Sequence, residues 1–257
     1  LFHEAVSVVS RLGGMGNMGQ WLTAKNCSIG RDDLLIGEKL DVAADEGYAR
    51  VELWWPFSTP EPAAEEMDEL VAGLEKRGQQ LVALNAWAGD MAGGERGILH
   101  QRDMPVGHID ALDYLHQRTG VRRFNVLLGA DGREASAAQV ARFGQVQSQL
   151  ERRFGGVAMV EPLSGKENYP VQTVVDAECV IAQVGGGLLL DVYHLAVNTG
   201  VSGVDEIVDS VRPEHVQVAD SPGRGAPGTG ELPLGEWMRR LRDAGYAGEI
   251  VGEWLPN

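Results

Sequence analysis

The chain has 257 residues, of which 44% are hydrophobic and 23% charged. Its length and ordinary globular composition fit one large domain with a substantial core, or two smaller ones. The formal net charge is −15, and so acidic a surface repels phosphate backbones and anionic lipids, so we expect no nucleic-acid and no membrane partner. We find no apolar run long enough to span a bilayer, no signal peptide, and two cysteines without CxxC spacing, which predicts a cytoplasmic protein with reduced thiols.

The first 21 residues differ in pattern from the rest of the chain. Apolar residues from Leu1 to Leu12 recur at helical spacing and predict a short helix. The glycines from Gly13 to Gly19 predict a flexible connector. We therefore assign residues 1–21 to an N-terminal extension and residues 22–257 to one main domain.

From Leu22 onward, short apolar runs alternate with longer amphipathic segments, which is typical of repeated βα units. The predicted strands are Leu22–Ile29, Ala49–Trp55, Gln80–Trp87, Arg123–Leu128, Gly156–Pro162, Gly187–Asp191, Glu214–Ala219 and Glu249–Trp254. The predicted helices are Asp32–Glu46, Pro60–Lys76, Asp110–Thr119, Ser136–Arg153, Val171–Gln183, Val204–Val211 and Leu234–Ala244.

Eight strands and seven helices predict an α/β fold, a (β/α)8 TIM barrel whose final helix is missing and which carries an extra N-terminal helical segment. An open, doubly wound sheet is the alternative, but no GxGxxG turn follows the first strand. We expect the Leu1–Leu12 helix to dock where the eighth helix would lie. It could instead stay undocked, or bind a neighbouring subunit in a homo-oligomer.

Six predicted strands carry a polar residue near their carboxyl ends, where a TIM barrel places its active site. These residues are Glu52, Asn85, Glu161, Asp191, Gln217 and Glu253. Any one of them could be a satisfied core polar group. Four carboxylates at one barrel mouth would repel one another strongly, and a bound cation is the simplest compensation. Oxygen-rich side chains favour one hard divalent ion, Mg²⁺ or Mn²⁺.

Further polar groups lie close to these strand ends. His194 follows Asp191 by three residues and is predicted to bind a substrate oxygen, while His215 either lines the barrel or orients a ligand. Two glycine-rich loops follow the third and seventh strands and carry Arg96 and Arg224. We interpret them as substrate-covering loops whose arginines suit a carboxylate or hydroxyl oxygen.

These motifs resemble hydroxypyruvate isomerase and its relatives in the xylose-isomerase-like TIM-barrel superfamily. The similarity extends from about Leu22 to Pro256 and is most specific in the C-terminal third. The matching stretches are Val51–Phe57 (VELWWPF), Ala88–Gly97 (AGDMAGGERG), Glu161–Leu163 (EPL), Asp191–His194 (DVYH), His215–Arg224 (HVQVADSPGR), Pro227–Glu231 (PGTGE), Gly245–Gly248 (GYAG) and Gly252–Trp254 (GEW).

The resemblance implies a metal held by side chains from strands five to eight, which here are Glu161, Asp191, Gln217 and Glu253. Related ketose 3-epimerases usually have histidine at the seventh-strand position, so Gln217 favours hydroxypyruvate isomerase. They also use a glutamate shortly after the fifth-strand ligand, and Glu167 stands at that offset as a candidate substrate-binding residue. Glu52 and Asn85 are further substrate-binding candidates.

The predicted reaction is a metal-dependent aldose–ketose isomerisation, most specifically of hydroxypyruvate to tartronate semialdehyde through an enediolate. Glu161 and Glu253 are predicted to transfer the proton as well as bind the metal. A hydride shift is the rival mechanism and usually needs two metals. The alternative functions are a ketose 3-epimerase, a 2-oxo-tetronate isomerase, a non-catalytic sugar binder and an endonuclease with a histidine-rich trinuclear zinc site.

Overall fold

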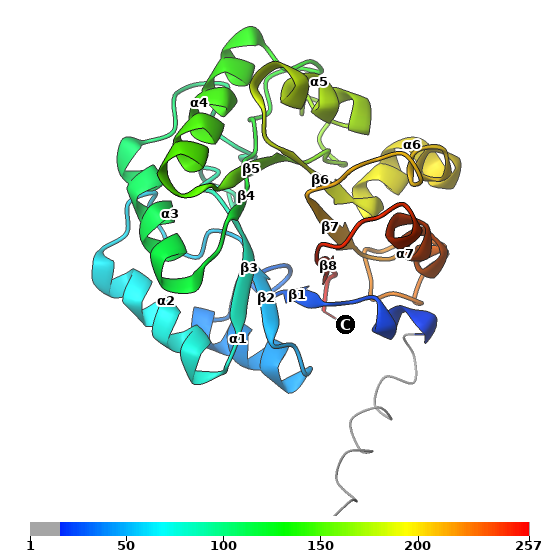
Figure 1. Cartoon of the computed structure of the whole chain (residues 1–257), viewed down its shortest axis with the longest axis horizontal. Helices are drawn as coiled ribbons and strands as arrows, with labels where there is room; N and C mark the ends of the chain where they lie inside the picture. Colours follow the sequence, from blue (N-terminus) through cyan, green and yellow to red (C-terminus); the bar gives the residue numbers. More distant parts are fainter. Residues whose placement is uncertain (1–15, 257) are drawn as a thin grey trace, which may run out of the picture.

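The computed structural model describes residues 16–256. Eight parallel strands close into a barrel in chain order, with the last strand hydrogen-bonded to the first, and helices surround it (Figure 1). This confirms the TIM barrel and excludes the open sheet. The predicted Leu1–Leu12 helix lies outside the described residues.

The strands of the barrel are short. They are β1 (Ala24–Asn26), β2 (Arg50–Leu53), β3 (Gln80–Asn85), β4 (Arg123–Asn125), β5 (Val157–Val160), β6 (Gly187–Asp191), β7 (His215–Val218) and β8 (Ile250–Gly252). The α-helices within the described residues are α1 (Ile36–Asp45), α2 (Ala64–Lys76), α3 (Val106–Thr119), α4 (Ala137–Phe154), α5 (Val174–Val184), α6 (Val192–Ile207) and α7 (Leu234–Asp243). As predicted, none of them follows β8.

Helix α4 shows how the sequence encodes these outer elements. At its start the Ser136 hydroxyl accepts a hydrogen bond from the Gln139 backbone N–H, and the Gln139 side chain accepts one from the Ser136 N–H. This capping box satisfies two N–H groups that the helix cannot pair internally. One face of the helix is buried through Val140 and Phe143. The helix ends at Gly155, whose φ of 68° is a left-handed conformation that favours glycine.

The prediction for α6 was wrong at its start. The helix begins directly after β6 at Val192, whereas the sequence indicated Val204. Asp191 makes the early start possible, because its side chain accepts hydrogen bonds from the backbone N–H groups of Tyr193 and His194. Gly200 then breaks the helical conformation at a kink, which concealed the continuous helix in the sequence pattern.

The predicted glycine connector was also wrong within its described part. Gly16–Gln20 forms a 3-10 helix (η2) that packs near α7, and Met18 is buried there. A buried methionine gives this turn an apolar anchor that spacing alone did not reveal. The domain boundary at residue 22 stays a prediction, although η2 already contacts the barrel.

The seam between β8 and β1 contains a buried lysine. Lys25 pairs in register with Gly252, and its Nζ lies 3.1 Å from the centroid of the Trp254 ring. The ammonium group has no hydrogen-bond partner among the described residues. Burial lowers the pKa of Lys25 from 10.5 to about 7.

Inside the barrel, apolar side chains fill a layer beneath the polar strand ends. Ala83, Met159 and Leu189 pack together in the lumen. Residues two apart on a strand share a face, so Met159 lies below Glu161 and Leu189 lies below Asp191. The apolar layer therefore leaves the carboxylates accessible only from the mouth.

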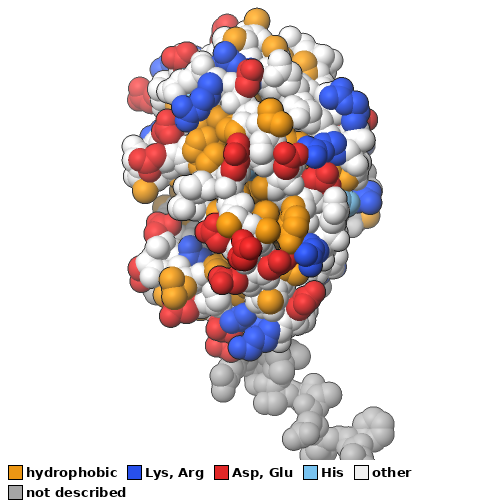
Figure 2. Space-filling model, turned by 90° about the vertical axis from the view of Figure 1, so that its left-hand side faces the viewer, with side chains coloured by type: hydrophobic (Ala, Val, Ile, Leu, Met, Phe, Trp, Pro, Cys, Tyr) orange, Lys and Arg blue, Asp and Glu red, His pale blue; other side chains and the backbone are white. Residues whose placement is uncertain are grey.

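The outer surface is polar. On the face shown in Figure 2, acidic and basic side chains are interspersed, with apolar side chains scattered between them. None of the helices in residues 16–256 is both long and apolar enough to span a membrane.

Candidate active site

A cavity of about 170 Å³ opens at the carboxyl ends of the strands. Its floor includes Glu161 and Glu253, and loops after β2, β3, β5 and β7 form its walls. The lining residues are Trp54, Asn85, Met91, Arg96, Leu127, Glu161, Leu163, Ser164, Gly165, Lys166, His194, Arg224 and Glu253. The structure thus brings predicted site residues from six segments of the chain to one cavity.

Glu161 follows β5 and is buried. One of its oxygens, Oε2, accepts a hydrogen bond of 2.6 Å from the amide of Asn125. The other, Oε1, lies 4.0 Å from Nε2 of His194. Burial raises the pKa of Glu161 well above its ordinary value, and the negative charges of Glu253 and Asp191 raise it further. The site therefore lacks enough positive charge to hold all its carboxylates ionised.

Glu253 follows β8 and is held by three donors. Its Oε1 accepts hydrogen bonds of 2.9 Å from both the Asn26 amide and the Trp54 indole, and its Oε2 accepts one of 2.6 Å from Arg224. Burial raises the pKa of Glu253 to about 8, against the lowering effect of Arg224, while Asp191 adds to the rise. These donors fix the orientation of the carboxylate.

Arg224 reaches into the site from the loop after β7. Its Nη2 donates to Oδ2 of Asp191 at 3.1 Å as well as to Glu253, so one guanidinium nitrogen bridges two predicted metal ligands. Its φ of 52° is left-handed and strained for a residue with a side chain. Asp220 fixes the loop by accepting hydrogen bonds from the backbone N–H groups of Ser221, Gly228 and Leu232.

Glu52 is buried and is not among the residues that line the cavity, and neither are Asp191 and Gln217. The substrate contact of Glu52 stays a prediction. The Glu52 carboxylate accepts hydrogen bonds from Asn26 (2.7 Å), Gln217 (2.5 Å) and His215 (2.5 Å). Burial alone would raise its pKa, but His215 and the amide donors lower it. His215 therefore orients the group that orients Gln217, in agreement with one of the two roles predicted for it.

The contact with Glu52 determines which way the Gln217 amide points. A carboxylate only accepts hydrogen bonds, so the atom facing Glu52 must be the NH₂ group. The amide oxygen then points away, and it is buried without a hydrogen-bond partner among the described residues. An orphaned buried oxygen is costly unless a ligand satisfies it.

His194 lies in the first turn of α6, three residues beyond the end of β6. Its Nδ1 accepts a hydrogen bond of 3.1 Å from the backbone N–H of Ser164, so the proton of the neutral ring is on Nε2. Burial lowers the pKa of His194 to about 4, so the ring is neutral. His194 therefore presents an N–H donor to the cavity, 3.6 Å from Oδ2 of Asp191.

The carboxylate and amide oxygens of this site suit a hard divalent cation. Glu161, Asp191 and His194 have ligand atoms within 4.8 Å of one another. The Nε2 proton of His194 makes it unsuited to coordinate, which leaves the two carboxylates of this trio. The free oxygen of Gln217 and the mutual repulsion of the acids are consistent with a cation held by Glu161, Asp191, Gln217 and Glu253.

Two of the remaining substrate-binding candidates line the cavity and one does not. Asn85, at the end of β3, and Arg96, in the loop after it, both face the cavity. Arg96 also donates to the backbone carbonyls of Met91 and Glu95 in its own loop. Glu167 is exposed to solvent and is not among the lining residues.

Sequence reasoning missed several residues of the site. Asn26 and Asn125 donate hydrogen bonds to Glu253 and Glu161 and are the last residues of β1 and β4. The predicted strands extended three residues further, so both asparagines looked internal rather than terminal. Lys166, in the loop after β5, had no sequence signal beyond its charge.

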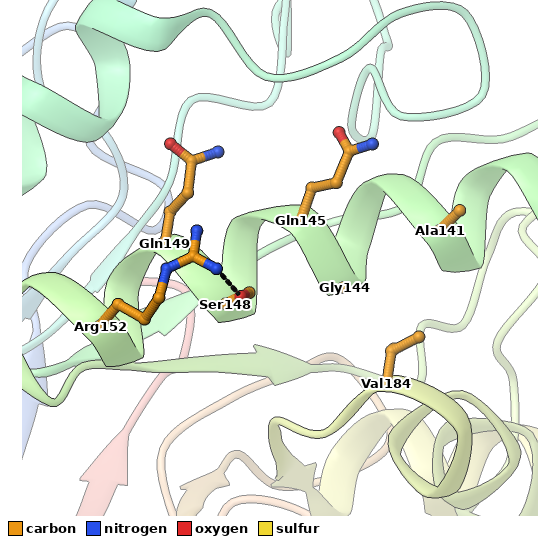
Figure 3. A pocket seen from close by; sticks show the side chains of 7 residues that line it. All are labelled: Ala141, Gly144, Gln145, Ser148, Gln149, Arg152 and Val184. Carbon is orange, nitrogen blue, oxygen red and sulfur yellow. Dashed lines mark hydrogen bonds between the residues drawn. The ribbon is translucent and has the colours of Figure 1, made fainter.

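A second hollow lies far from this chemistry, on the outside of α4 (Figure 3). Its one charged group, Arg152, donates a hydrogen bond of 2.7 Å to Ser148, drawn as a dashed line. The remaining lining side chains are small, apolar or amide groups. It offers no acid, base or metal ligand.

The histidines described by the structure do not converge on a zinc cluster. His108 lies beneath Trp55, where Nδ1–H donates to the carbonyl of Pro60 and Nε2 accepts from the N–H of Trp87. His116 stacks on Phe154, away from the mouth. Nothing in residues 16–256 therefore supports the histidine-rich endonuclease site considered as an alternative.

Comparison with known proteins agrees with this geometry. Residues 40–257 match the model of the xylose isomerase-like TIM barrel family. The chain belongs to that family. It is 33% identical over 252 residues to a Streptomyces coelicolor protein named "Putative hydroxypyruvate isomerase", covering 90% of each chain. It is 26% identical to the 2-oxo-tetronate isomerase of Cupriavidus necator, covering 91% of this chain and 92% of the relative.

A solved structure of an AP endonuclease, family 2, from Brucella melitensis shares the fold with a TM-score of 0.77. Its sequence is 22% identical, and the match covers 92% of this chain and 93% of that one. At this identity the likeness supports the barrel and nothing about the reaction.

Proposed function

We propose that this protein is a metal-dependent isomerase that interconverts hydroxypyruvate and tartronate semialdehyde by proton transfer. The isomerase class agrees with the names of both sequence relatives. The observation that carries the proposal is the pairing of two buried carboxylates, Glu161 and Glu253, at one small cavity. The unsatisfied buried amide oxygen of Gln217 supports it.

The isomerisation removes a proton from one carbon and returns it to the next. A divalent cation, Mg²⁺ or Mn²⁺, would stabilise the negative charge of the enediolate when bound. Glu161, Asp191, Gln217 and Glu253 would hold it. Everything else in the reaction depends on side chains that position the substrate and move the proton.

We assign the first proton transfer to Glu161. Both oxygens of Glu253 already accept hydrogen bonds, from three donors in all, so neither oxygen is free to take a proton from carbon. Glu161 receives one hydrogen bond, on Oε2, and Oε1 faces the cavity. A base needs an oxygen free to take the proton, and Oε1 of Glu161 meets that need. Glu253, whose pKa is raised to about 8, starts protonated and gives its proton to the neighbouring carbon, while the hydroxyl proton passes from one substrate oxygen to the other. Exchange with solvent then removes the proton from Glu161 and restores the one on Glu253.

His194 stabilises charge on the substrate, and Arg224 holds two of the acids in position. The Nε2–H of His194 donates to the oxygen that becomes negative, and the ring need not change protonation because its pKa is about 4. Arg224 keeps Asp191 and Glu253 in place through its bridging nitrogen. The hydrogen bonds that Asp220 accepts from its own loop hold Arg224 in this position.

A 2-oxo-tetronate is the second candidate substrate, because a relative with that activity is 26% identical over nearly the whole chain. It has the same ketol and carboxylate with one more carbon. A ketose 3-epimerase is less well supported, since Gln217 replaces the usual histidine and Glu167 lies outside the cavity. A non-catalytic sugar binder would not need two opposed acid–base groups.

Turnover of the purified protein tests the proposal. We expect Mn²⁺- or Mg²⁺-loaded protein to convert hydroxypyruvate, and chelation to stop it reversibly. In D₂O, one of the two C3 hydrogens of recovered hydroxypyruvate should exchange with solvent, above the rate without enzyme. Conversion without exchange would favour a hydride shift, and no conversion of either sugar acid would refute the proposed function.

A further inference from the structure

We propose that Lys166 and Arg96 together form the binding site for the carboxylate of the substrate. The proposal rests on the function proposed above and narrows it to sugar acids in preference to neutral sugars. It assigns a role to Lys166, which belongs to no recognised motif of the chain. It also separates the anion site from Arg224, which the sequence had suggested for the same task.

Lys166 is placed at the cavity by a contact between two loops. It lies in the loop after β5 and lines the cavity, and its Nζ donates a hydrogen bond of 3.0 Å to the carbonyl of Gly94 in the loop after β3. Arg96 is two residues further along that second loop and lines the same cavity. The Lys166–Gly94 bond therefore brings the two cations to one wall.

These two cations are uncompensated. Within residues 16–256, neither Lys166 nor Arg96 has a carboxylate oxygen within 4.0 Å of a side-chain nitrogen. Arg224 differs, because Asp191 and Glu253 both pair with it. A lysine ammonium has three donors, and the contact with Gly94 uses one. Free, charged donors thus face the cavity from this wall.

The distribution of charge determines how a sugar acid is oriented in the cavity. The floor carries Glu161 and Glu253 together with the cation proposed to compensate them, and the chain as a whole carries a net charge of −15. An anionic substrate can enter only where local positive charge reverses that field. A ketol directed to the floor and a carboxylate directed to Lys166 and Arg96 satisfy both ends of a small sugar acid.

Pairs of ligands with similar shape but different charge show whether binding depends on the carboxylate. D-Glycerate and glycerol differ by a carboxylate in place of a hydroxymethyl group, and so do hydroxypyruvate and dihydroxyacetone. We would measure dissociation constants of D-glycerate and glycerol by calorimetry, and KM and kcat for hydroxypyruvate and dihydroxyacetone. The variants are Lys166→Met, Lys166→Gln, Lys166→Arg and Arg96→Met. Lys39→Met, which removes a charge on α1 outside the cavity, is the control.

We expect Lys166→Met and Arg96→Met each to weaken D-glycerate binding and raise KM for hydroxypyruvate about tenfold or more, the size of effect typical of a lost charge-assisted hydrogen bond. Glycerol binding and any dihydroxyacetone turnover should stay unchanged. Lys166→Gln keeps a donor for Gly94 but loses the charge, so it should behave like Lys166→Met. Lys166→Arg should restore most of the affinity, and Lys39→Met should match wild type.

Three results would overturn the inference. They are an absence of D-glycerate binding by the wild type, an equal loss for charged and neutral ligands, and a Lys166→Gln variant that binds D-glycerate normally. The last would mean that Lys166 serves only to hold Gly94. Charge-dependent D-glycerate binding by a protein that does not isomerise hydroxypyruvate would support the carboxylate site while refuting the proposed reaction.

Discussion

Replacing Glu52 tests whether a residue outside the cavity controls the metal site. Glu52→Ala removes the acceptor for Asn26, Gln217 and His215 at once. Each hydrogen bond to a charged group contributes about 1.5–3 kcal/mol. Breaking a buried ionic network of this kind costs about 3–5 kcal/mol overall. In a chain of this size we expect the melting temperature to fall on the order of 10 °C.

The same substitution should weaken metal binding, because the Gln217 amide loses the partner that directs its oxygen toward the site. Losing a residue that orients a ligand typically weakens metal affinity about 10–100-fold. We would measure the Mn²⁺ dissociation constant of folded Glu52→Ala by calorimetry at a temperature well below its melting point. Measuring affinity on folded protein separates orientation of the ligand from general loss of stability.

Glu52→Gln is the matched control. Nδ1 of His215 has no hydrogen-bond partner among the described residues, so the ring proton can move there and Nε2 can accept from the new amide. The remaining oxygen of the new side chain still accepts from Gln217. We expect this variant to keep Mn²⁺ affinity much closer to wild type than Glu52→Ala does. Unchanged Mn²⁺ affinity in folded Glu52→Ala would refute the orienting role.

Three further predictions test other parts of the structure. Glu253→Gln should keep the fold and lower kcat at least a hundredfold, as expected for a lost acid–base group; near-normal turnover would leave it a ligand only. Burial lowers the pKa of His108 to about 4, so between pH 6.5 and 4 the unfolded chain binds more protons than the folded one. The free energy of unfolding should therefore fall by about 3 kcal/mol as the pH drops through this range. Urea titrations of His108→Gln at several pH values should lack this part of the pH dependence. Lys25→Met should stabilise the fold by about 2–4 kcal/mol below pH 7, where the wild type buries a charge. The gain in unfolding free energy should shrink as the pH approaches 10.5, because the wild-type lysine is then neutral in the folded state. An equal gain at pH 6.5 and 9.5 would contradict a buried ammonium.

The barrel could be predicted because its strands are buried on both faces and its helices on one. Continuous apolar runs such as that before Asp191 indicate a parallel strand, and glycine after an amphipathic segment indicates a helix end. The start of α6 could not be predicted in this way. The strand passes directly into a helix capped by Asp191, with no polar turn to mark the boundary, and Gly200 interrupts the helical pattern.

The acidic part of the site was predictable for a related reason. A charged residue at the end of an apolar strand is conspicuous, and the carboxyl ends of all eight strands meet at one mouth. The contacts around these acids were not predictable, since which atom of Gln217 is left free for a ligand depends on Glu52, from a strand more than 160 residues away. Strand ends drawn too late also concealed Asn26 and Asn125.

The structure explains why His194 and Gln217 have different roles although both lie beside Asp191. The Ser164 N–H occupies Nδ1 of His194, which leaves Nε2 protonated and able only to donate into the cavity. The NH₂ group of Gln217 donates to Glu52, which leaves the amide oxygen free to accept a hydrogen bond or bind a cation. In each case a contact with a neighbouring group determines whether the remaining polar atom of the side chain donates or accepts. A histidine in place of Gln217 would have one ring proton, which it would donate to Glu52 from one nitrogen. The other ring nitrogen would then be free to bind a cation. Gln217→His should therefore preserve the metal site and its Mn²⁺ affinity, whereas Gln217→Leu should abolish binding; loss of Mn²⁺ binding in Gln217→His alone would show that the Glu52 contact does not set the ligand atom.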